Sequence, residues 1–151
     1  MSRAGMGWLL VVLQFALLIV LVLVPRRDPT LLSLVVGVPL LALGLVLGLA
    51  ASRRLGSALT PTPVPITQAG LRTEGIYAVL RHPIYSAVLL AALGFTVIMG
   101  TWWTVGVFVV LVGFFTLKYR WEDRLLAQEY GTQWEAWSRQ TGALIPRRRR
   151  P

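Results

Sequence analysis

Four long runs of hydrophobic residues, separated by shorter polar segments, dominate this chain. They cover approximately residues 7–24, 30–51, 83–99 and 101–118. Each run is close to the roughly 17–25 residues that an α-helix needs to cross a bilayer. An open chain can satisfy its backbone groups in lipid only as a helix, so the pattern predicts four transmembrane helices. The expected fold is an all-α integral membrane protein with one membrane domain, residues 1–151.

The third and fourth runs are predicted to form a tight antiparallel hairpin. They are separated by little more than Gly100 and Thr101. Trp102 and Trp103 follow at this turn, and indole side chains favour the membrane–water interface. The turn is therefore expected to lie at one surface of the bilayer.

Proline and glycine interrupt the second run. Pro39 is expected to kink its helix. Gly44 and Gly48 form a GxxxG pattern which, with Gly37, would allow close contact with another helix. Glycine is also simply frequent in membrane helices, so both interpretations stay open.

The distribution of positive charge predicts the orientation of the helices. If all four cross the membrane, every Lys and Arg except Arg26 and Arg27 belongs to the side that holds both termini. The positive-inside rule therefore places both termini in the cytoplasm. The membrane is expected to be the plasma (inner) membrane. The loop of residues 52–82 and the C-terminal region of residues 119–151 then face the cytoplasm as well.

Both cytoplasmic regions have recognisable patterns. The TPTPVP sequence of residues 60–65 predicts extended backbone, because alternating prolines are incompatible with helix. A helix is expected to continue out of the membrane until Gly131 interrupts it. The C-terminal region is predicted to form an interfacial helix against the lipid headgroups. The residues that suit this helix are Trp121, Leu125, Trp134 and Trp137.

Composition supports a membrane protein and narrows its chemistry. Hydrophobic residues make up 56% of the chain and charged residues 14%, whereas soluble proteins contain about 25% charged residues. The absence of cysteine excludes disulfides, thiolate nucleophiles and cysteine metal sites. A metal site is not expected, since there is only one histidine. We interpret the net charge of +9, including the terminal RRRR, as a signal for topology and attraction to anionic lipids and not for nucleic-acid binding.

The only histidine, His82, lies in the sequence GIYAVLRHPIY, where the polar loop meets the third run. Proline is favoured at the first helical position, so a helix is expected to begin at Pro83 with His82 just outside it. Free backbone N–H groups at this helix start, together with Arg81, would form a weak anion site. Tyr77 and Tyr85 could stack on a flat ligand or attract a cationic one.

An acidic pair, Glu122 and Asp123, follows the fourth run, near the expected end of its helix. Glu122 lies four residues after Lys118, so the two share a helix face. Because the hairpin returns to the same membrane depth, the start of the third helix should meet the end of the fourth. The side chains expected to meet there are His82, Tyr85, Lys118 and Glu122. Taken singly, each of these residues is also typical of a membrane-border anchor or a solvated helix face.

The order of these motifs resembles the isoprenylcysteine carboxyl methyltransferase family. GIY and RHPIY precede a membrane hairpin, an acidic pair and then YG..W..W, and the resemblance covers residues from about 54 to 146. Phospholipid N-methyltransferases and some bacterial thiol methyltransferases look similar in this region. Ala87 replaces the glycine of the family's RHPxYxG pattern, and Lys118 stands where the family usually has arginine.

The resemblance implies an enzyme that transfers a methyl group from S-adenosyl-L-methionine to a lipophilic substrate at the membrane. A carboxylate is the expected acceptor, with a phospholipid amine or a thiol as alternatives. By position, Lys118 would contact the substrate and Arg120 could substitute for it. His82 is a possible proton acceptor, although binding the cofactor suits it better. The implied cofactor-binding residues are Gly70, Leu71, Arg72, Tyr77, His82, Pro83, Ile84, Tyr85 and Glu122.

Two other classes of function remain open at this point. A non-catalytic membrane scaffold or lipid-binding protein could keep the same fold. A transporter or channel subunit is less well supported, because the hydrophobic runs contain almost no charge to mark a polar pathway.

Overall fold

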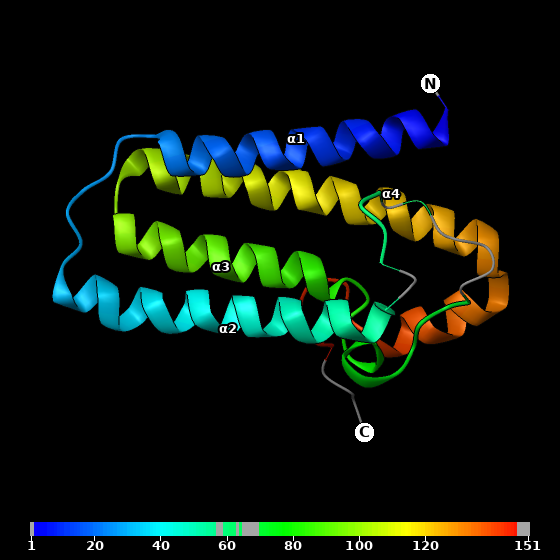
Figure 1. The fold of residues 1–151 in the computed structure, drawn as a ribbon. Helices are drawn as coiled ribbons and strands as arrows, with labels where there is room; N and C mark the ends of the chain where they lie inside the picture. Colours follow the sequence, from blue (N-terminus) through cyan, green and yellow to red (C-terminus); the bar gives the residue numbers. More distant parts are fainter. Residues whose placement is uncertain (1, 57–58, 63, 65–69, 148–151) are drawn as a thin grey trace.

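The computed structural model describes residues 2–147 apart from 57–58, 63 and 65–69, and its helices form an elongated bundle (Figure 1). Three helices, α1, α2 and α4, are long and apolar enough to cross a membrane, and α3 is a shorter apolar helix. These helices indicate an integral membrane protein. The elements are α1 (Arg3–Leu23), α2 (Leu31–Leu55), the 3₁₀ helix η3 (Gly75–Ala78), α3 (Pro83–Met99) and α4 (Trp102–Gln140).

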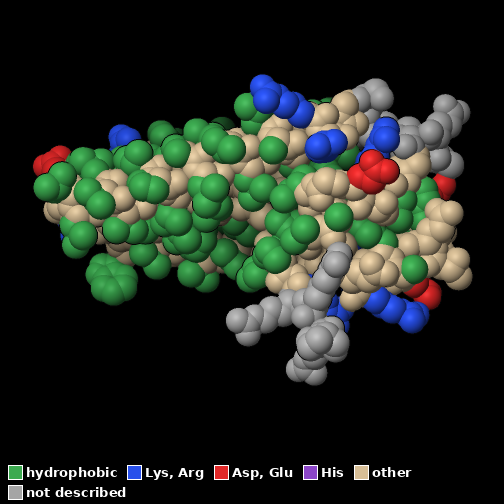
Figure 2. Space-filling view, turned by 90° about the horizontal axis from the view of Figure 1, so that it is seen from below, with side chains coloured by type: hydrophobic (Ala, Val, Ile, Leu, Met, Phe, Trp, Pro, Cys, Tyr) green, Lys and Arg blue, Asp and Glu red, His purple; other side chains and the backbone are tan. Residues whose placement is uncertain are grey.

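The four long helices run alternately in opposite directions, so the bundle has two distinct ends (Figure 1). The polar end holds the start of α1, the end of α2, η3 and the start of α3. The turn end holds the connections α1–α2 and α3–α4. Figure 2 shows hydrophobic side chains along the bundle and most of the visible charged side chains gathered at the polar end.

Helix α4 differs most from its predicted extent. It continues to Gln140, and its helical geometry is broken at Gly131, where φ is 50° and ψ is −122°. The predicted interruption at Gly131 is therefore present. Glu122 and Asp123 lie in the middle of this helix and not near its C-terminus, which corrects the prediction from the length of the hydrophobic run. Helix α2 passes through Pro39 without ending.

Helices α2 and α3 pack backbone to backbone because glycines remove side chains from their contact. A Cβ atom on Gly44 would lie 2.6 Å from the nitrogen of Ala91, and one on Gly94 would lie 2.5 Å from the nitrogen of Leu41. A Cβ on Gly37 would lie 2.7 Å from a backbone oxygen of α3. Such contacts leave no room for a side chain, as is typical of closely packed membrane helices.

Ala87 is accommodated by a glycine on the facing helix. It is buried in α3, and its Cβ lies opposite Gly48, where an added Cβ would still be 3.4 Å away. The methyl group that replaces the expected glycine therefore fits without separating α2 from α3.

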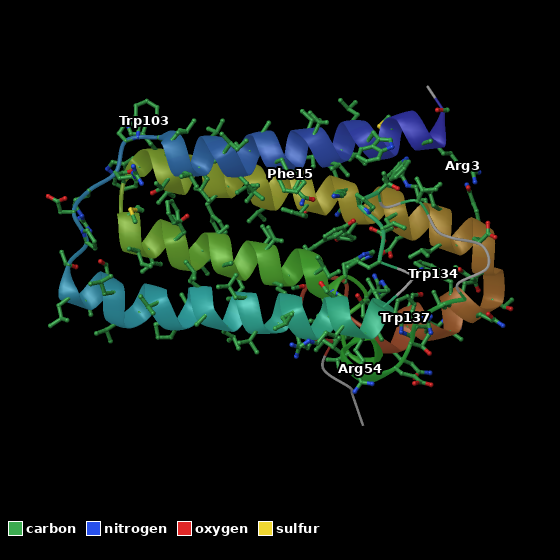
Figure 3. All side chains as sticks on the ribbon, in the orientation of Figure 1. Arg3, Phe15, Arg54, Trp103, Trp134 and Trp137 are labelled. Atoms are coloured by element: carbon green, nitrogen blue, oxygen red, sulfur yellow. The ribbon has the colours of Figure 1, made fainter. Side chains whose placement is uncertain are left out.

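The turn end of the bundle contains the predicted hairpin. Gly100 ends α3 in the left-handed conformation, and the Thr101 side chain caps the start of α4. The Thr101 hydroxyl also donates to the carbonyl of Pro25, 2.9 Å away, which ties the α1–α2 connection to the hairpin. Trp102 and Trp103 are 90% and 65% exposed, and Figure 3 shows Trp103 at this end.

Candidate functional site

A cavity of about 230 Å³ lies at the polar end, between α1, α3, α4 and the loop before α3. Its wall includes Lys118 and all nine residues predicted to bind the cofactor. Arg120 is exposed and lies outside the wall. The structure therefore brings most of the predicted residues together, whereas their binding roles stay predictions.

His82 is held between two carboxylates of α4, those of Glu122 and Asp123. Its Nε2 atom lies 2.9 Å from Oδ1 of Asp123, and its Nδ1 atom lies 3.6 Å from Oε2 of Glu122. The imidazole stacks on the Tyr85 ring, with centroids 5.4 Å apart and planes inclined by 4°. The Tyr85 hydroxyl donates to Oε2 of Glu122 at 2.6 Å. The predicted meeting of His82, Tyr85 and Glu122 is thus present in the structure.

Lys118 joins this group from the preceding turn of α4. Its Nζ atom lies 4.9 Å from the centroid of the Tyr85 ring, and the residue is only 2% exposed. The ammonium donates to Oε1 of Gln14 on α1. A buried ammonium in a cavity wall requires polar partners, and here Gln14 and the face of Tyr85 supply them.

Asp123 does not line the cavity, but it fixes two residues that do. Oδ2 of Asp123 accepts from Arg81 at 3.1 Å while Oδ1 faces His82. Burial raises the pKa of the Asp123 carboxyl, but the hydrogen bond and charge of His82 and the charge of Arg81 outweigh burial and hold this pKa below its ordinary value. An ionised carboxylate only accepts hydrogen bonds, so Nε2 of His82 is the donor in this contact.

The segment that follows α4 returns to the start of α3. The backbone N–H groups of Arg81 and His82 donate to the carbonyls of Gly142 and Ala143 at 2.8 and 3.1 Å. The Arg81 guanidinium donates to the carbonyl of Thr141 at 2.7 Å. These donors, including the guanidinium that was expected to reinforce an anion site, are engaged within the protein, whereas the anion site at the start of α3 stays a prediction.

Aromatic residues of α4 complete the wall on this side. Nε1 of Trp137 donates to the carbonyl of Tyr77 at 2.8 Å, and both side chains line the cavity. The Arg81 guanidinium lies 5.9 Å from the Trp134 ring centroid. Trp134 and Trp137 both lie at the polar end (Figure 3). These tryptophans, which were predicted to face lipid headgroups, make contacts within the protein. Burial of Tyr77, together with the negative charge of Glu122, raises the pKa of the Tyr77 hydroxyl above its ordinary value.

The sequence did not identify several residues of the wall. For Gln14 a signal existed, because it is the single amide in the first hydrophobic run. The wall residues absent from the predicted set include Gln14, Leu59, Thr60, Pro61, Thr62, Val64, Leu126, Tyr130 and Trp137.

Two of the sequence patterns lie partly outside the described residues: Pro63 and Pro65 of the TPTPVP sequence, and Arg148 to Arg150 of the basic tail.

Comparison with known proteins places this chain in a family. Residues 32–133, more than half of the chain, match the phospholipid methyltransferase family. Proteins named probable protein-S-isoprenylcysteine O-methyltransferase from Oryza sativa subsp. indica and subsp. japonica are each 32% identical over 80 residues. These matches cover 52% of this chain and 42% of each relative, so the chain spans less than half the length of these relatives.

The fold is also similar to a solved structure. That structure is the eukaryotic intramembrane Ras methyltransferase ICMT (isoprenylcysteine carboxyl methyltransferase), with a TM-score of 0.70 and 23% sequence identity. The similarity covers 95% of this chain and 50% of that one. The chain therefore belongs to the phospholipid methyltransferase family, and its predicted resemblance to isoprenylcysteine carboxyl methyltransferases is confirmed.

Proposed function

We propose that this protein is an S-adenosyl-L-methionine-dependent methyltransferase that methylates a lipophilic carboxylate at the cytoplasmic border of the plasma (inner) membrane. The observation that carries the proposal is the convergence of His82, Tyr85 and Glu122 in one cavity. Family membership and the names of the relatives support methyl transfer as the type of reaction.

The chemistry of the cavity wall suits the parts of this cofactor. Glu122 and the faces of Tyr77 and Tyr85 suit its positively charged groups. Tyr77 and Trp137 present flat rings for an adenine base, and Arg72 suits a carboxylate. Gly70, Leu71, Pro83 and Ile84 would complete the surface around the cofactor. When bound, S-adenosyl-L-methionine supplies a methyl group activated by its attachment to a sulfonium.

In the proposed reaction, Lys118 holds the acceptor carboxylate with one oxygen directed at the methyl carbon. With S-adenosyl-L-methionine bound, its methyl carbon would form a bond to that oxygen as its bond to sulfur breaks, and the electron pair of the broken bond would go to sulfur. The products are a methyl ester and S-adenosylhomocysteine. No proton is transferred, so His82 serves to position groups and not as a base. Alignment alone can lower such a barrier by up to about 7–11 kcal/mol in ideal cases, and a cavity shielded by lipid excludes water.

The antiparallel bundle with its single polar end supports a proposed membrane arrangement. All four long helices cross the bilayer, with α3 held against α2 by their glycine contacts, and the polar end faces the cytoplasm. The cofactor enters from the cytoplasm, and the lipophilic acceptor enters from the bilayer between helices. Arginines of the polar end, such as Arg53 and Arg54, attract anionic lipids.

Cofactor binding tests this proposal directly. Isothermal titration of the purified protein in detergent with S-adenosylhomocysteine should show binding. His82→Ala and Glu122→Gln should each weaken it by at least about tenfold, which is the effect of losing one hydrogen bond to a charged group. Glu135→Gln is the matched control, because Glu135 is exposed and its carboxylate pairs with Arg139 in its own helix. Absence of binding to folded wild-type protein would contradict the proposed function.

The acceptor is identified with a methyl-labelled cofactor and isolated membranes. A carboxylate acceptor gives label that is released by mild base, as expected for an ester. Label that stays in extracted phospholipid after base treatment would indicate an amine, and volatile label a small thioether. Either of these results would contradict the carboxylate part of the proposal while leaving methyl transfer in place.

A further inference from the structure

Gln14 is an amide in the middle of α1, a helix that carries no other polar side chain after Arg3. It lies 11 residues after the start of α1, which is about 17 Å along the helix axis, and its side chain lines the cavity. Helix α1 precedes residues 32–133, which match the family. A polar side chain at such a position is costly unless it has a partner. The partner is Lys118, whose ammonium donates to Oε1 of Gln14.

The contact fixes the orientation of the Gln14 amide. Lysine only donates hydrogen bonds, so the oxygen of Gln14 must face Lys118, and the amide NH₂ group retains two N–H donors. The Lys118 ammonium has three donors and uses one of them on Gln14. The two side chains therefore present several N–H donors at one place in the cavity wall.

The position of the pair gives the cavity two electrically distinct regions. Lys118 lies one helical turn before Glu122, on the side of the hydrophobic run. The Tyr85 ring lies between them, under the Lys118 ammonium and hydrogen-bonded to Glu122. An anionic group that enters from the bilayer thus meets Lys118 and Gln14 before it meets the carboxylates of α4.

We propose that Gln14 and Lys118 together recognise the acceptor carboxylate, with the ammonium on one oxygen and the Gln14 amide on the other. A lone ammonium is a point charge and cannot bind both oxygens in the planar manner of arginine. The amide supplies the second directed donor. The inference rests on the proposed function and assigns Gln14 as a specificity-determining residue for a lipophilic carboxylate.

Gln14→Glu is the decisive variant. It keeps the length of the side chain and an oxygen to accept from Lys118, so the protein should fold, but it removes both N–H donors and adds negative charge. The probe is N-acetyl-S-farnesylcysteine, which joins a carboxylate to an isoprenyl tail. We expect KM for this acceptor to rise by at least about tenfold, while kcat and the affinity for S-adenosylhomocysteine change by less than about threefold.

A rescue variant distinguishes recognition of the acceptor carboxylate by Gln14 from a contribution of Gln14 to the stability of the fold. Gln14→Met alone should also raise KM, and adding Lys118→Arg should lower it again, because the guanidinium provides a bidentate contact without help. Phe15→Leu is the control, since Phe15 is adjacent in α1 and 56% exposed.

Each other result overturns the inference. An unchanged KM in Gln14→Glu shows that the amide does not contact the acceptor. A parallel loss of kcat, cofactor affinity and thermal stability, without rescue by Lys118→Arg, shows a structural role. Methylation of farnesylamine or farnesylthiol in preference to the carboxylate, with cofactor binding intact, contradicts this inference and the carboxylate part of the proposed function, while leaving methyl transfer in place. A wild-type protein that does not bind S-adenosylhomocysteine contradicts the proposed function itself.

Discussion

Asp123 shows how a residue outside the cavity can determine its shape. One carboxylate oxygen fixes the ring of His82 and the other fixes Arg81. Arg81 in turn donates to the carbonyls of Ser138 and Thr141 at the end of α4. A single side chain in the middle of α4 thereby connects the start of α3 with the C-terminal segment.

Replacing Asp123 with asparagine should destabilise the protein in a pH-dependent manner. At pH 7 we expect Asp123→Asn to lower the free energy of unfolding by about 1–3 kcal/mol, since a partly buried charged contact is lost. The pKa of Asp123 is lowered in the folded protein, whereas in the unfolded chain it is about 3.9. Its stabilising effect is therefore complete well above that value and disappears as the pH falls through the folded pKa.

Thermal unfolding in detergent at several pH values tests this expectation. The difference in stability between wild type and Asp123→Asn should shrink below about pH 4. Glu129→Gln, on the exposed surface of α4, should behave like wild type throughout. A difference that stays constant from pH 7 to pH 2 would show that the charge of Asp123 is not the stabilising feature.

The Tyr85 hydroxyl should contribute to cofactor binding through Glu122. It donates to Oε2 of Glu122 at 2.6 Å, which is shorter than the 3.6 Å between that oxygen and Nδ1 of His82. Tyr85→Phe keeps the ring that stacks on His82 but frees the carboxylate, so we expect affinity for S-adenosylhomocysteine to fall by about tenfold in calorimetry. Thr116→Val removes a hydroxyl from α4 that donates to Val112 in the same helix and should leave the affinity unchanged. Equal affinities for Tyr85→Phe and wild type would exclude this role.

The sequence predicts some contacts of this site and misses others for a physical reason. The sequence predicted that three side chains meet, because the short hairpin places the start of the third helix and the end of the fourth hydrophobic run at the same membrane depth. These side chains are His82, Tyr85 and Glu122. Gln14 and Lys118 are 104 positions apart, and no periodicity of α1 indicates which helix it faces. Trp137 was recognised as interfacial by residue type, but its bond to Tyr77 depends on the bend at Gly131.

At the scale of elements, the contact between α2 and α3 is the most sensitive to added volume. Gly44→Ala would place a methyl group 2.6 Å from a backbone nitrogen, and such overpacking typically costs about 1–3 kcal/mol. We expect a lower melting temperature in detergent. Gly106→Ala is the control, because among the described residues no atom outside the neighbouring turns of its own helix lies within 4 Å of its added Cβ, and alanine favours helix. If Gly44→Ala melted at the same temperature as Gly106→Ala, the two helices would not be in backbone contact.

For helices, the sequence predicts where each one lies but not which helix it packs against. The hydrophobic runs predicted the positions of the four long helices, because a chain that crosses lipid must be helical and must be long enough to span the bilayer. The GxxxG pattern in α2 was visible, but Gly94 on α3 is equally important to the contact. A pattern within one helix identifies a face suited to packing and does not identify its partner. The return of residues 141–144 to the start of α3 has no local signal at all, because it uses backbone groups of ordinary residues.

At the scale of the whole molecule, the two ends of the bundle differ in the side chains that they present. The cavity and the carboxylates lie at the polar end, whereas the turn end carries two highly exposed tryptophans and one short charged connection. A bilayer that spans the apolar middle would place these ends in different compartments. This orientation determines whether a soluble cofactor of the cytoplasm can reach the cavity.

Labelling of introduced cysteines can establish this orientation, because the natural chain has no cysteine and gives no background. We expect Asp28→Cys to react in intact cells with a maleimide that does not cross membranes. Ser2→Cys, Glu74→Cys and Arg139→Cys, at exposed positions of the polar end, should react only after permeabilisation. The pair Glu74→Cys and Arg139→Cys is the critical one, since both legs of the hairpin lie between these positions. Opposite accessibility of the two would show that one leg of the hairpin does not cross the bilayer. Labelling of both in intact cells would place the cavity on the wrong side for a cytoplasmic cofactor.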